Sequence, residues 1–224
     1  MKKFIISIDQ GTTSSRAILF DLKGKPIFSS QKEFTQYFPN SGWVEHNPEE
    51  IWSTTKKVLK DVIQKAKRVK GKILTIGITN QRETTVLWDK KTGKPVYNAI
   101  VWQDRRQEVY CEKLRKQNKE TLIFNRTGLL IDSYFSGMKI KWILDNVPKA
   151  KALMNKKQLL FGTIDSFLIW RFTKGKVHAT DATNASRTMI YNISSNKWDD
   201  KILNLLKIKK HILPEVKDCA DDYG

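Results

Sequence analysis

The fold of this chain is decided by the stretch Phe4-Ile5-Ile6-Ser7-Ile8-Asp9-Gln10-Gly11-Thr12-Thr13-Ser14-Ser15-Arg16-Ala17-Ile18-Leu19-Phe20-Asp21. Two short apolar runs flank a turn made of glycine, hydroxyl and amide residues, which predicts two strands joined by a tight connection. Gly11 has no Cβ, so a ligand can approach the backbone closely there. The backbone N–H groups of such a turn, together with the hydroxyls of Thr12, Thr13 and Ser14, can hold phosphate oxygens.

Asp9 ends the first of these strands. It is placed to meet a phosphate-bound Mg²⁺ through water, because Mg²⁺ keeps much of its hydration shell. Taken alone, the same pattern also fits an ordinary surface hairpin. The rest of the chain decides between the two interpretations.

Length and composition indicate a folded globular protein. The chain has 224 residues, of which 40% are hydrophobic, enough for one large domain or two small ones around a real core. No apolar run approaches the ~20 residues needed to cross a bilayer. The apolar start is too short for a signal peptide, and Cys111 and Cys219 do not form a metal or CxxC spacing. A cytoplasmic location is therefore expected.

The formal net charge of +18 raises the question of nucleic acid binding. The densest basic stretch, 56–72, carries a single apolar stripe at helical spacing that includes Val58, Leu59 and Val62, so its lysines line the opposite, solvated face. Lysine far outnumbers arginine, whereas phosphate-reading surfaces favour arginine. Nucleic acid binding is therefore kept only as the weaker alternative.

The order of predicted elements indicates an α/β protein. A third extended run, Pro26 to Tyr37, makes an antiparallel meander with the first two strands. Asn47-Pro48-Glu49-Glu50 starts a helix that runs to about Lys70. Ile73 to Thr79 then has the composition of a buried parallel strand. These elements predict a mixed sheet with helices packed against it.

The second half of the chain predicts a hairpin and three helices. Thr84 to Trp88 and Tyr97 to Trp102 are the arms of the hairpin. Helical patterns occupy Arg105 to Gln117, Ser136 to Asp145 and Thr163 to Phe172.

Arg82 and Glu83 follow directly on the strand that ends at Thr79. Ligands of α/β sheets usually bind at that end of the strands. Glu83 can accept from two vicinal hydroxyls and Arg82 can donate to a third oxygen, which suits a polyhydroxyl molecule. The alternative is an exposed ion pair of ~0–1 kcal/mol.

Two further segments carry aromatic side chains at the ends of predicted elements. Trp102 can offer an apolar wall to a small polyol, while the neighbouring Asp104 is expected to cap a helix. Tyr134 lies just before a predicted helix whose N-cap is expected at Ser136, and it can point a phenol into a cleft.

With these residues in view, the sequence resembles the FGGY family of carbohydrate kinases, and within it the glycerol kinases. The resemblance covers essentially the whole chain and rests on seven motifs in order. They are DQGTTSSRA (9–17), GWVEHNP (42–48), ITNQRETT (78–85), VWQDRR (101–106), YFSGMKIKWILDN (134–146), GTIDSFLIW (162–170) and TDATNASRTMIYNI (180–193). RETT with WQDRR favours glycerol kinases over xylulose and gluconate kinases.

The resemblance implies an actin-like, ribonuclease H-like ATPase domain that transfers a phosphoryl group from ATP to glycerol, giving glycerol 3-phosphate. It implies ATP and Mg²⁺ as cofactors. The ATP phosphates would be bound by Thr12, Thr13, Ser14 and Arg16, and Mg²⁺ by Asp9. Glycerol would be bound by Arg82, Glu83 and Tyr134, with Trp102 as an apolar wall.

The chain also departs from the family pattern. Family members are roughly twice as long, and the Gly-Asp-Gln-Gln motif that carries their general base does not occur in this sequence. The aspartate that acts as the base is therefore expected beyond Gly224, and no residue of 1–224 is assigned a catalytic role. Asp221 and Asp222 lie in the wrong local context to replace it.

Residues 1–224 are therefore expected to be the N-terminal FGGY domain, incomplete at its C-terminal end and without the second FGGY domain. We expect no useful kinase activity unless the C-terminal half is supplied in cis or in trans. A homo-oligomer is possible for the complete enzyme.

Two other functions remain open at this point. The chain could belong to a kinase for another small polyol or sugar. It could also be a non-catalytic remnant that binds a polyol.

Overall fold

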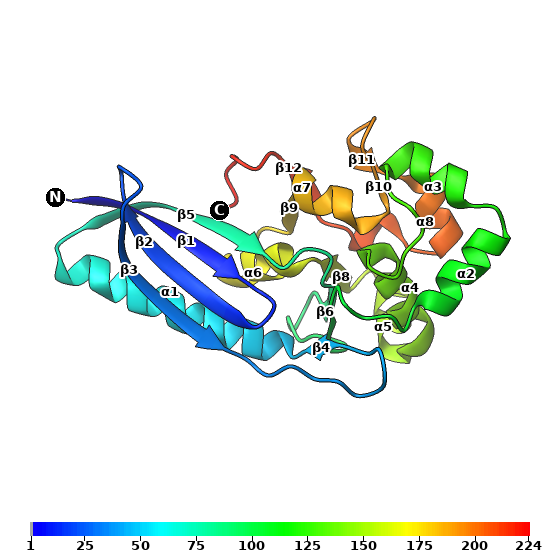
Figure 1. The fold of residues 1–224 in the computed structure, drawn as a ribbon, viewed down its shortest axis with the longest axis horizontal. Helices are drawn as coiled ribbons and strands as arrows, with labels where there is room; N and C mark the ends of the chain where they lie inside the picture. The colour runs from blue at the N-terminus through cyan, green and yellow to red at the C-terminus, as the bar shows by residue number, and fades with distance from the viewer. Residues whose placement is uncertain (1) are drawn as a thin grey trace. The chain divides into compact units, whose positions relative to one another are not determined.

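The structure, a computed structural model, describes residues 2–224. They form two compact units, one made of residues 2–36 and 46–81 and the other of residues 37–45 and 82–224. Figure 1 shows the order of the elements along the chain.

A four-stranded mixed sheet forms the first unit. It contains β1 (Lys3–Gln10), β2 (Ser14–Asp21), β3 (Pro26–Glu33) and β5 (Lys72–Asn80), in the order β3-β2-β1-β5 (Figure 1). β2 is antiparallel to both β1 and β3, whereas β5 is parallel to β1. The predicted meander is confirmed, although its third strand ends at Glu33 rather than at Tyr37.

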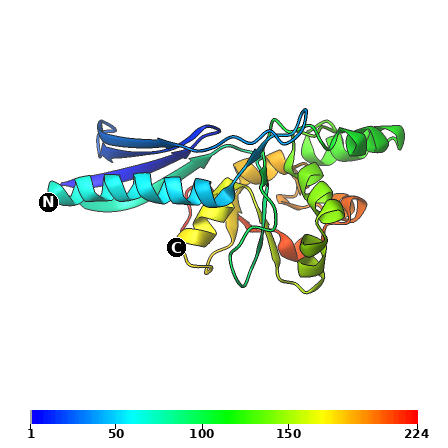
Figure 2. The same cartoon turned by 90° about the horizontal axis from the view of Figure 1, so that it is seen from below.

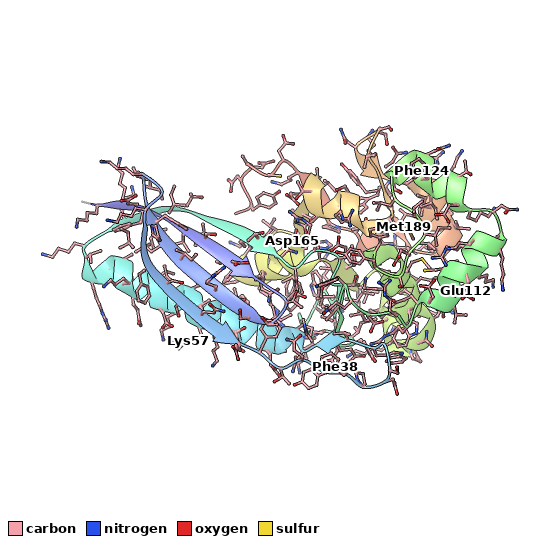
Figure 3. All side chains as sticks on the ribbon, viewed as in Figure 1. Phe38, Lys57, Glu112, Phe124, Asp165 and Met189 are labelled. Carbon is pink, nitrogen blue, oxygen red and sulfur yellow. The ribbon has the colours of Figure 1, made fainter. Side chains whose placement is uncertain are left out.

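The single helix of this unit, α1 (Pro48–Arg68), runs along the sheet (Figure 2). Its start is as predicted, because the Asn47 side chain accepts a hydrogen bond from the Glu49 N–H and Pro48 occupies the first turn. The predicted apolar stripe is buried, while the side chain of Lys57 (Figure 3) is exposed and forms an ion pair with Asp61 one turn further along the helix.

The prediction that residues 73–79 form a buried strand is wrong in one respect. The strand is parallel, as expected, but β5 is the edge of the sheet and most of its residues are exposed. Leu74 and Ile76 are 47% and 42% exposed. An apolar run shows that a strand can be buried but not that another element covers it.

The second unit combines short strand pairs with seven helices within residues 82–224. Its strand pairs are antiparallel β6 (Val86–Asp89) with β8 (Leu159–Gly162), parallel β9 (Ala179–Asp181) with β12 (Glu215–Lys217), and antiparallel β10 (Tyr191–Asn192) with β11 (Lys197–Trp198). Its helices are α2 (Glu108–Lys116), α3 (Glu120–Thr127), α4 (Ser136–Asn146), α5 (Pro148–Asn155), α6 (Ile164–Phe172), α7 (Ala182–Ala185) and α8 (Asp200–Leu206), with short 3-10 turns η1 (Ser186–Thr188) and η2 (Lys210–Ile212).

The hairpin predicted over 84–102 is present, but the strands in its two arms pair with other segments of the chain. Hydrogen bonds join Thr85 to Ile100 and Leu87 to Val96 across it. However, β6 forms its ladder with β8, and the second arm keeps only the short strand β7 (Ala99–Ile100), which pairs with β4 (Glu45–His46).

Helix α4 lies in the middle of the apolar core of the second unit. Met138, Ile140 and Ile143 of this helix are completely buried. Gly137 brings the helix close to η1, because a Cβ at this position would lie 2.9 Å from both the Ile190 side chain and the Thr188 carbonyl oxygen. The contact between α4 and η1 therefore requires glycine at position 137.

Candidate functional site

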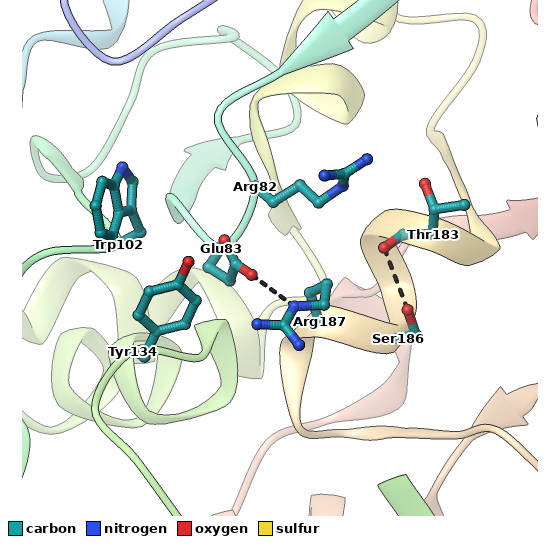
Figure 4. Close-up of a pocket in the computed structure, with 7 residues that line it drawn as sticks. All are labelled: Arg82, Glu83, Trp102, Tyr134, Thr183, Ser186 and Arg187. Carbon is teal, nitrogen blue, oxygen red and sulfur yellow. Dashed lines mark hydrogen bonds and ion pairs between the residues drawn. The ribbon is translucent and has the colours of Figure 1, made fainter. Parts of the chain in front are cut away.

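A pocket of about 520 Å³ in the second unit contains the four residues that the sequence predicts for substrate binding. Arg82, Glu83, Trp102 and Tyr134 all line it (Figure 4). Thr183, Ser186 and Arg187 complete the lining. The sequence did not predict these three as site residues, although they lie in the motif TDATNASRTMIYNI at 180–193.

The backbone of Glu83 is held in an unusual conformation. Its φ angle is 62°, in the left-handed region that side chains other than glycine rarely adopt. Two hydroxyls hold its carbonyl oxygen, Ser136 Oγ at 3.0 Å and Thr85 Oγ1 at 3.1 Å. Such a strained conformation, costing about 1–2 kcal/mol, is common at ligand sites and directs the carboxylate here.

The Glu83 carboxylate is paired with an arginine inside the pocket. Arg187 Nε donates to Glu83 Oε1 over 2.7 Å (Figure 4). Only 5% of the Glu83 side chain is exposed, against 37% for Arg187. The pair is thus partly shielded from water, and the buried carboxylate has a counter-charge.

Tyr134 and Trp102 form an aromatic wall. Their ring centroids lie 5.6 Å apart at an interplanar angle of 60°. The N–H of Tyr134 donates to Asp132 Oδ1 over 2.7 Å, which fixes the start of the segment leading into α4. Ser136 is the first residue of α4 rather than its cap, because its hydroxyl is used by Glu83.

Lys139 also fixes the segment that leads into α4. Its ammonium group is completely buried and donates to the carbonyl oxygens of Ser133 (3.1 Å) and Tyr134. Desolvation by burial lowers the pKa of Lys139 to about 7, although the carboxylates of Asp104 and Glu83 oppose this shift.

A buried charge network fixes the segment that carries Trp102. Arg106 forms ion pairs of 2.8 Å with both Glu45 and Asp104, and its guanidinium lies 3.7 Å from the centre of the Trp43 ring. The expectation that Asp104 caps a helix is wrong. Its carboxylate binds Arg106 and the N–H of Val44 instead, and α2 begins only at Glu108.

The residues predicted to bind ATP phosphate and Mg²⁺ lie in the first unit. The turn between β1 and β2 places Thr12, Thr13 and Ser14 next to one another, closed by a hydrogen bond from the Gly11 N–H to the Ser14 carbonyl. Asp9 and Arg16 face each other across the strands in an ion pair of 2.6 Å. The pair is solvent-exposed, so both groups can change partner at little cost.

A buried polar network holds this turn from inside the unit. Gln81 Nε2 lies 3.0 Å from the Gly11 carbonyl and 3.3 Å from His46 Nδ1. Gln36 lies 2.6 Å from His46 Nε2 and donates to the Thr12 carbonyl. Burial lowers the pKa of His46 to about 4, so the ring is neutral at pH 7 and can accept at Nδ1 while donating at Nε2.

The donor set near the turn suits Mg²⁺ bound mainly through phosphate and water. Within residues 2–224 there is no group of three or more His, Cys, Asp or Glu side chains that could hold a metal ion. A single carboxylate such as Asp9 is compatible with Mg²⁺, which proteins often hold through one or two carboxylates together with substrate phosphates.

The end of the chain takes no part in the pocket. Gly224 and the two nearby carboxylates, Asp221 and Asp222, are exposed and do not line it. Lys217 Nζ lies 3.9 Å from Asp221 Oδ1, and the Gly224 N–H donates to Asp222 Oδ1. Both carboxylates thus have local partners, and the expectation that the catalytic base lies beyond Gly224 stays a prediction.

Comparison with known proteins identifies the class first. The fold is that of the carbohydrate kinases, which contain an actin-like ATPase domain. The crystal structure of Plasmodium falciparum glycerol kinase with ADP matches with a TM-score of 0.95 and 36% identity, over 100% of this chain and 44% of that chain. Gluconate kinase from Lactobacillus acidophilus matches with a TM-score of 0.84 and 26% identity, over 97% of this chain and 42% of that one.

The chain belongs to the FGGY family of carbohydrate kinases. The model of the family's N-terminal domain matches residues 4–224. Among curated relatives, the glycerol kinase of Alkaliphilus oremlandii is 59% identical and that of Rhizobium meliloti 56% identical, each over 224 residues. This chain spans 44% and 45% of their lengths, less than half.

These comparisons confirm the predicted family and the α/β fold class with its mixed sheet. The predicted extent of the domain and the roles of the individual site residues stay predictions. None of the helices described between residues 2 and 224 is long and apolar enough to cross a membrane.

Proposed function

We propose that this chain provides the glycerol pocket and the phosphate-binding turn of an ATP-dependent glycerol kinase. The observation that carries the proposal is the convergence of Arg82, Glu83, Trp102 and Tyr134 on one pocket. The high identity to glycerol kinases over the whole of this chain supports the same substrate.

The chemistry of the pocket suits a small polyol. Glu83 Oε1 is occupied by Arg187, which leaves Oε2 to accept hydrogen bonds from hydroxyl groups of glycerol. The Arg82 guanidinium donates to a further oxygen, and charge-assisted hydrogen bonds of this kind are stronger than neutral ones. Trp102 and Tyr134 cover the carbon edge of the ligand.

The turn of the first unit is proposed as the site of the ATP phosphates. Thr12, Thr13 and Ser14 present hydroxyls and backbone N–H groups, and Arg16 adds a positive charge. Asp9 is the proposed ligand of Mg²⁺, held through water. When bound, Mg²⁺ neutralises phosphate charge during the transfer.

Transfer in the complete enzyme takes the γ-phosphoryl group of ATP to a primary hydroxyl of glycerol and leaves ADP. The base that accepts the hydroxyl proton is proposed to come from the Gly-Asp-Gln-Gln motif of a C-terminal half, beyond Gly224 and supplied in cis or in trans. Without that base alone the rate falls by ~10²–10⁴-fold. The proposed setting is the cytoplasm, with no membrane or nucleic acid partner.

A coupled assay of glycerol-dependent ADP formation tests this function. We expect turnover when the chain is mixed with a matching C-terminal half, and none with the chain alone. Glu83→Gln should abolish most of that turnover, whereas Lys210→Gln, which removes an exposed ion pair with Asp200, should not. Turnover that is insensitive to Glu83→Gln would contradict the proposed role of the pocket.

The volume of the pocket favours a second candidate function. A volume of about 520 Å³ falls in the range of sites for drug-sized ligands, which is large for a three-carbon molecule. The same site could therefore serve a kinase for a larger polyol or sugar. Tighter binding of a pentose than of glycerol by the chain would support that alternative.

A further inference from the structure

Arg187 reaches the pocket from far along the chain. It lies 104 residues after Glu83, in the 3-10 turn η1. The turn is placed against α4 by the close approach at Gly137 and is closed by a left-handed residue, Met189, with a φ of 63°. The fold therefore holds the Arg187 backbone in a defined position beside the pocket.

The guanidinium of Arg187 is held on two sides. Nε donates to Glu83 Oε1, and the guanidinium carbon lies 5.0 Å from the centre of the Phe135 ring and 5.7 Å from that of Tyr134. Contacts at these distances are favourable cation–π interactions. A planar guanidinium can make both contacts at once, whereas a lysine ammonium is a point charge that forms no fork.

As a result, the two oxygens of the Glu83 carboxylate differ in their hydrogen bonds. Within residues 2–224, Glu83 Oε2 has no hydrogen bond, and neither have the two terminal nitrogens of Arg187. Because Arg187 occupies Oε1, the carboxylate plane is fixed and Oε2 stays available in the pocket. The carboxylate would otherwise be a nearly buried charge without a counter-ion.

We propose that Arg187 is a positioning residue for polyol binding: it orients the Glu83 carboxylate so that Oε2 accepts from the ligand. This inference rests on the proposed function of the pocket as a glycerol site. It assigns to η1, which lines the pocket but supplies none of the proposed direct ligand contacts, a role in setting the affinity of that site.

The test is glycerol binding to the full 224-residue chain, measured by isothermal titration calorimetry. The variants are Arg187→Met, Arg187→Lys, Glu83→Gln and the double variant of Arg187→Met with Glu83→Gln. Arg126→Met is the matched control, because Arg126 forms an ion pair of the same 2.7 Å length with Asp199 outside the lining of this pocket. Thermal unfolding of each variant shows that it is folded.

We expect Arg187→Met to weaken glycerol binding roughly tenfold to a hundredfold, the range of a hydrogen bond to a charged group. Arg187→Lys should restore part of the loss, since it keeps the charge but not the planar contacts. In the Glu83→Gln background, Arg187→Met should change the dissociation constant by less than about threefold, because the two residues act through one interaction.

Three results would overturn the inference. Equal effects of Arg187→Met and Arg126→Met would make the ion pair merely structural. An undiminished effect of Arg187→Met in the Glu83→Gln background would make Arg187 a direct ligand contact. Absence of glycerol binding by the unaltered chain would reject the proposed glycerol site, and the inference with it. This failure is distinct from the other two, because it is seen with the unaltered chain before any variant is compared.

Discussion

Replacing Lys139 with methionine removes a fully buried cation while keeping a similar side-chain volume, and we expect it to change how stability depends on pH. In the folded chain, burial lowers the pKa of Lys139 from 10.5 to about 7. In the unfolded chain the group regains its ordinary pKa. Between these two values the unfolded state binds more protons than the folded state, so the free energy of unfolding rises with pH.

The size of the effect follows from these two pKa values. Each unit of pKa difference corresponds to about 1.4 kcal/mol, and only part of the shift is sampled between pH 7 and pH 9.5. For a folded pKa of about 7 and an unfolded pKa of 10.5, the contribution of Lys139 to the free energy of unfolding changes by about 3 kcal/mol over that interval. Well below pH 7 both states carry the proton and the dependence disappears.

Urea unfolding of the original chain and of Lys139→Met at pH 7, 8, 9 and 9.5 measures this contribution. All other titrating groups are shared, so they cancel in the difference between the two proteins. We expect the original chain to gain about 3 kcal/mol relative to the variant as the pH rises. Parallel pH profiles would refute the reasoning, because they would mean that the ammonium group is not desolvated in the folded chain.

Three further outcomes are expected. Ser136→Ala removes a hydroxyl from the Glu83 carbonyl and should weaken glycerol binding several-fold in calorimetry, whereas Ser53→Ala on the exposed side of α1 should not. Asn47→Ala should lower the free energy of unfolding by about 1 kcal/mol in urea titration, through loss of the α1 cap; no change would contradict the cap. Ile76→Lys should reduce self-association of the chain in light scattering, because it places a charge on the exposed edge strand β5, while Leu22→Lys in a turn should have little effect.

The sequence predicts those elements of the fold whose signals are local. The meander around Gly11 and the start of α1 at Asn47 depend on turn residues and caps that lie next to the elements they define. The burial of β5 could not be predicted in this way. Leu74 and Ile76 look like core residues in the sequence, but their exposure depends on whether another element lies beside the strand.

The residues of the pocket could likewise be predicted only in part. Arg82, Glu83, Trp102 and Tyr134 follow strand ends or precede a helix, so their positions could be read from neighbouring residues. Arg187 has no such signal, because it meets Glu83 only after the chain has folded through α4 and η1. Asp104 was misassigned as a cap for the same reason, since its partner Val44 comes from a distant segment.

The left-handed backbone at Glu83 has a consequence for laboratory evolution. Glycine at this position would relieve strain of about 1–2 kcal/mol, while it would remove the ion pair between Glu83 and Arg187. A library of variants selected only for resistance to heat is therefore expected to enrich glycine or asparagine at position 83, at the expense of ligand binding. Engineering this scaffold for durability requires a screen that reports occupancy of the pocket in the same round.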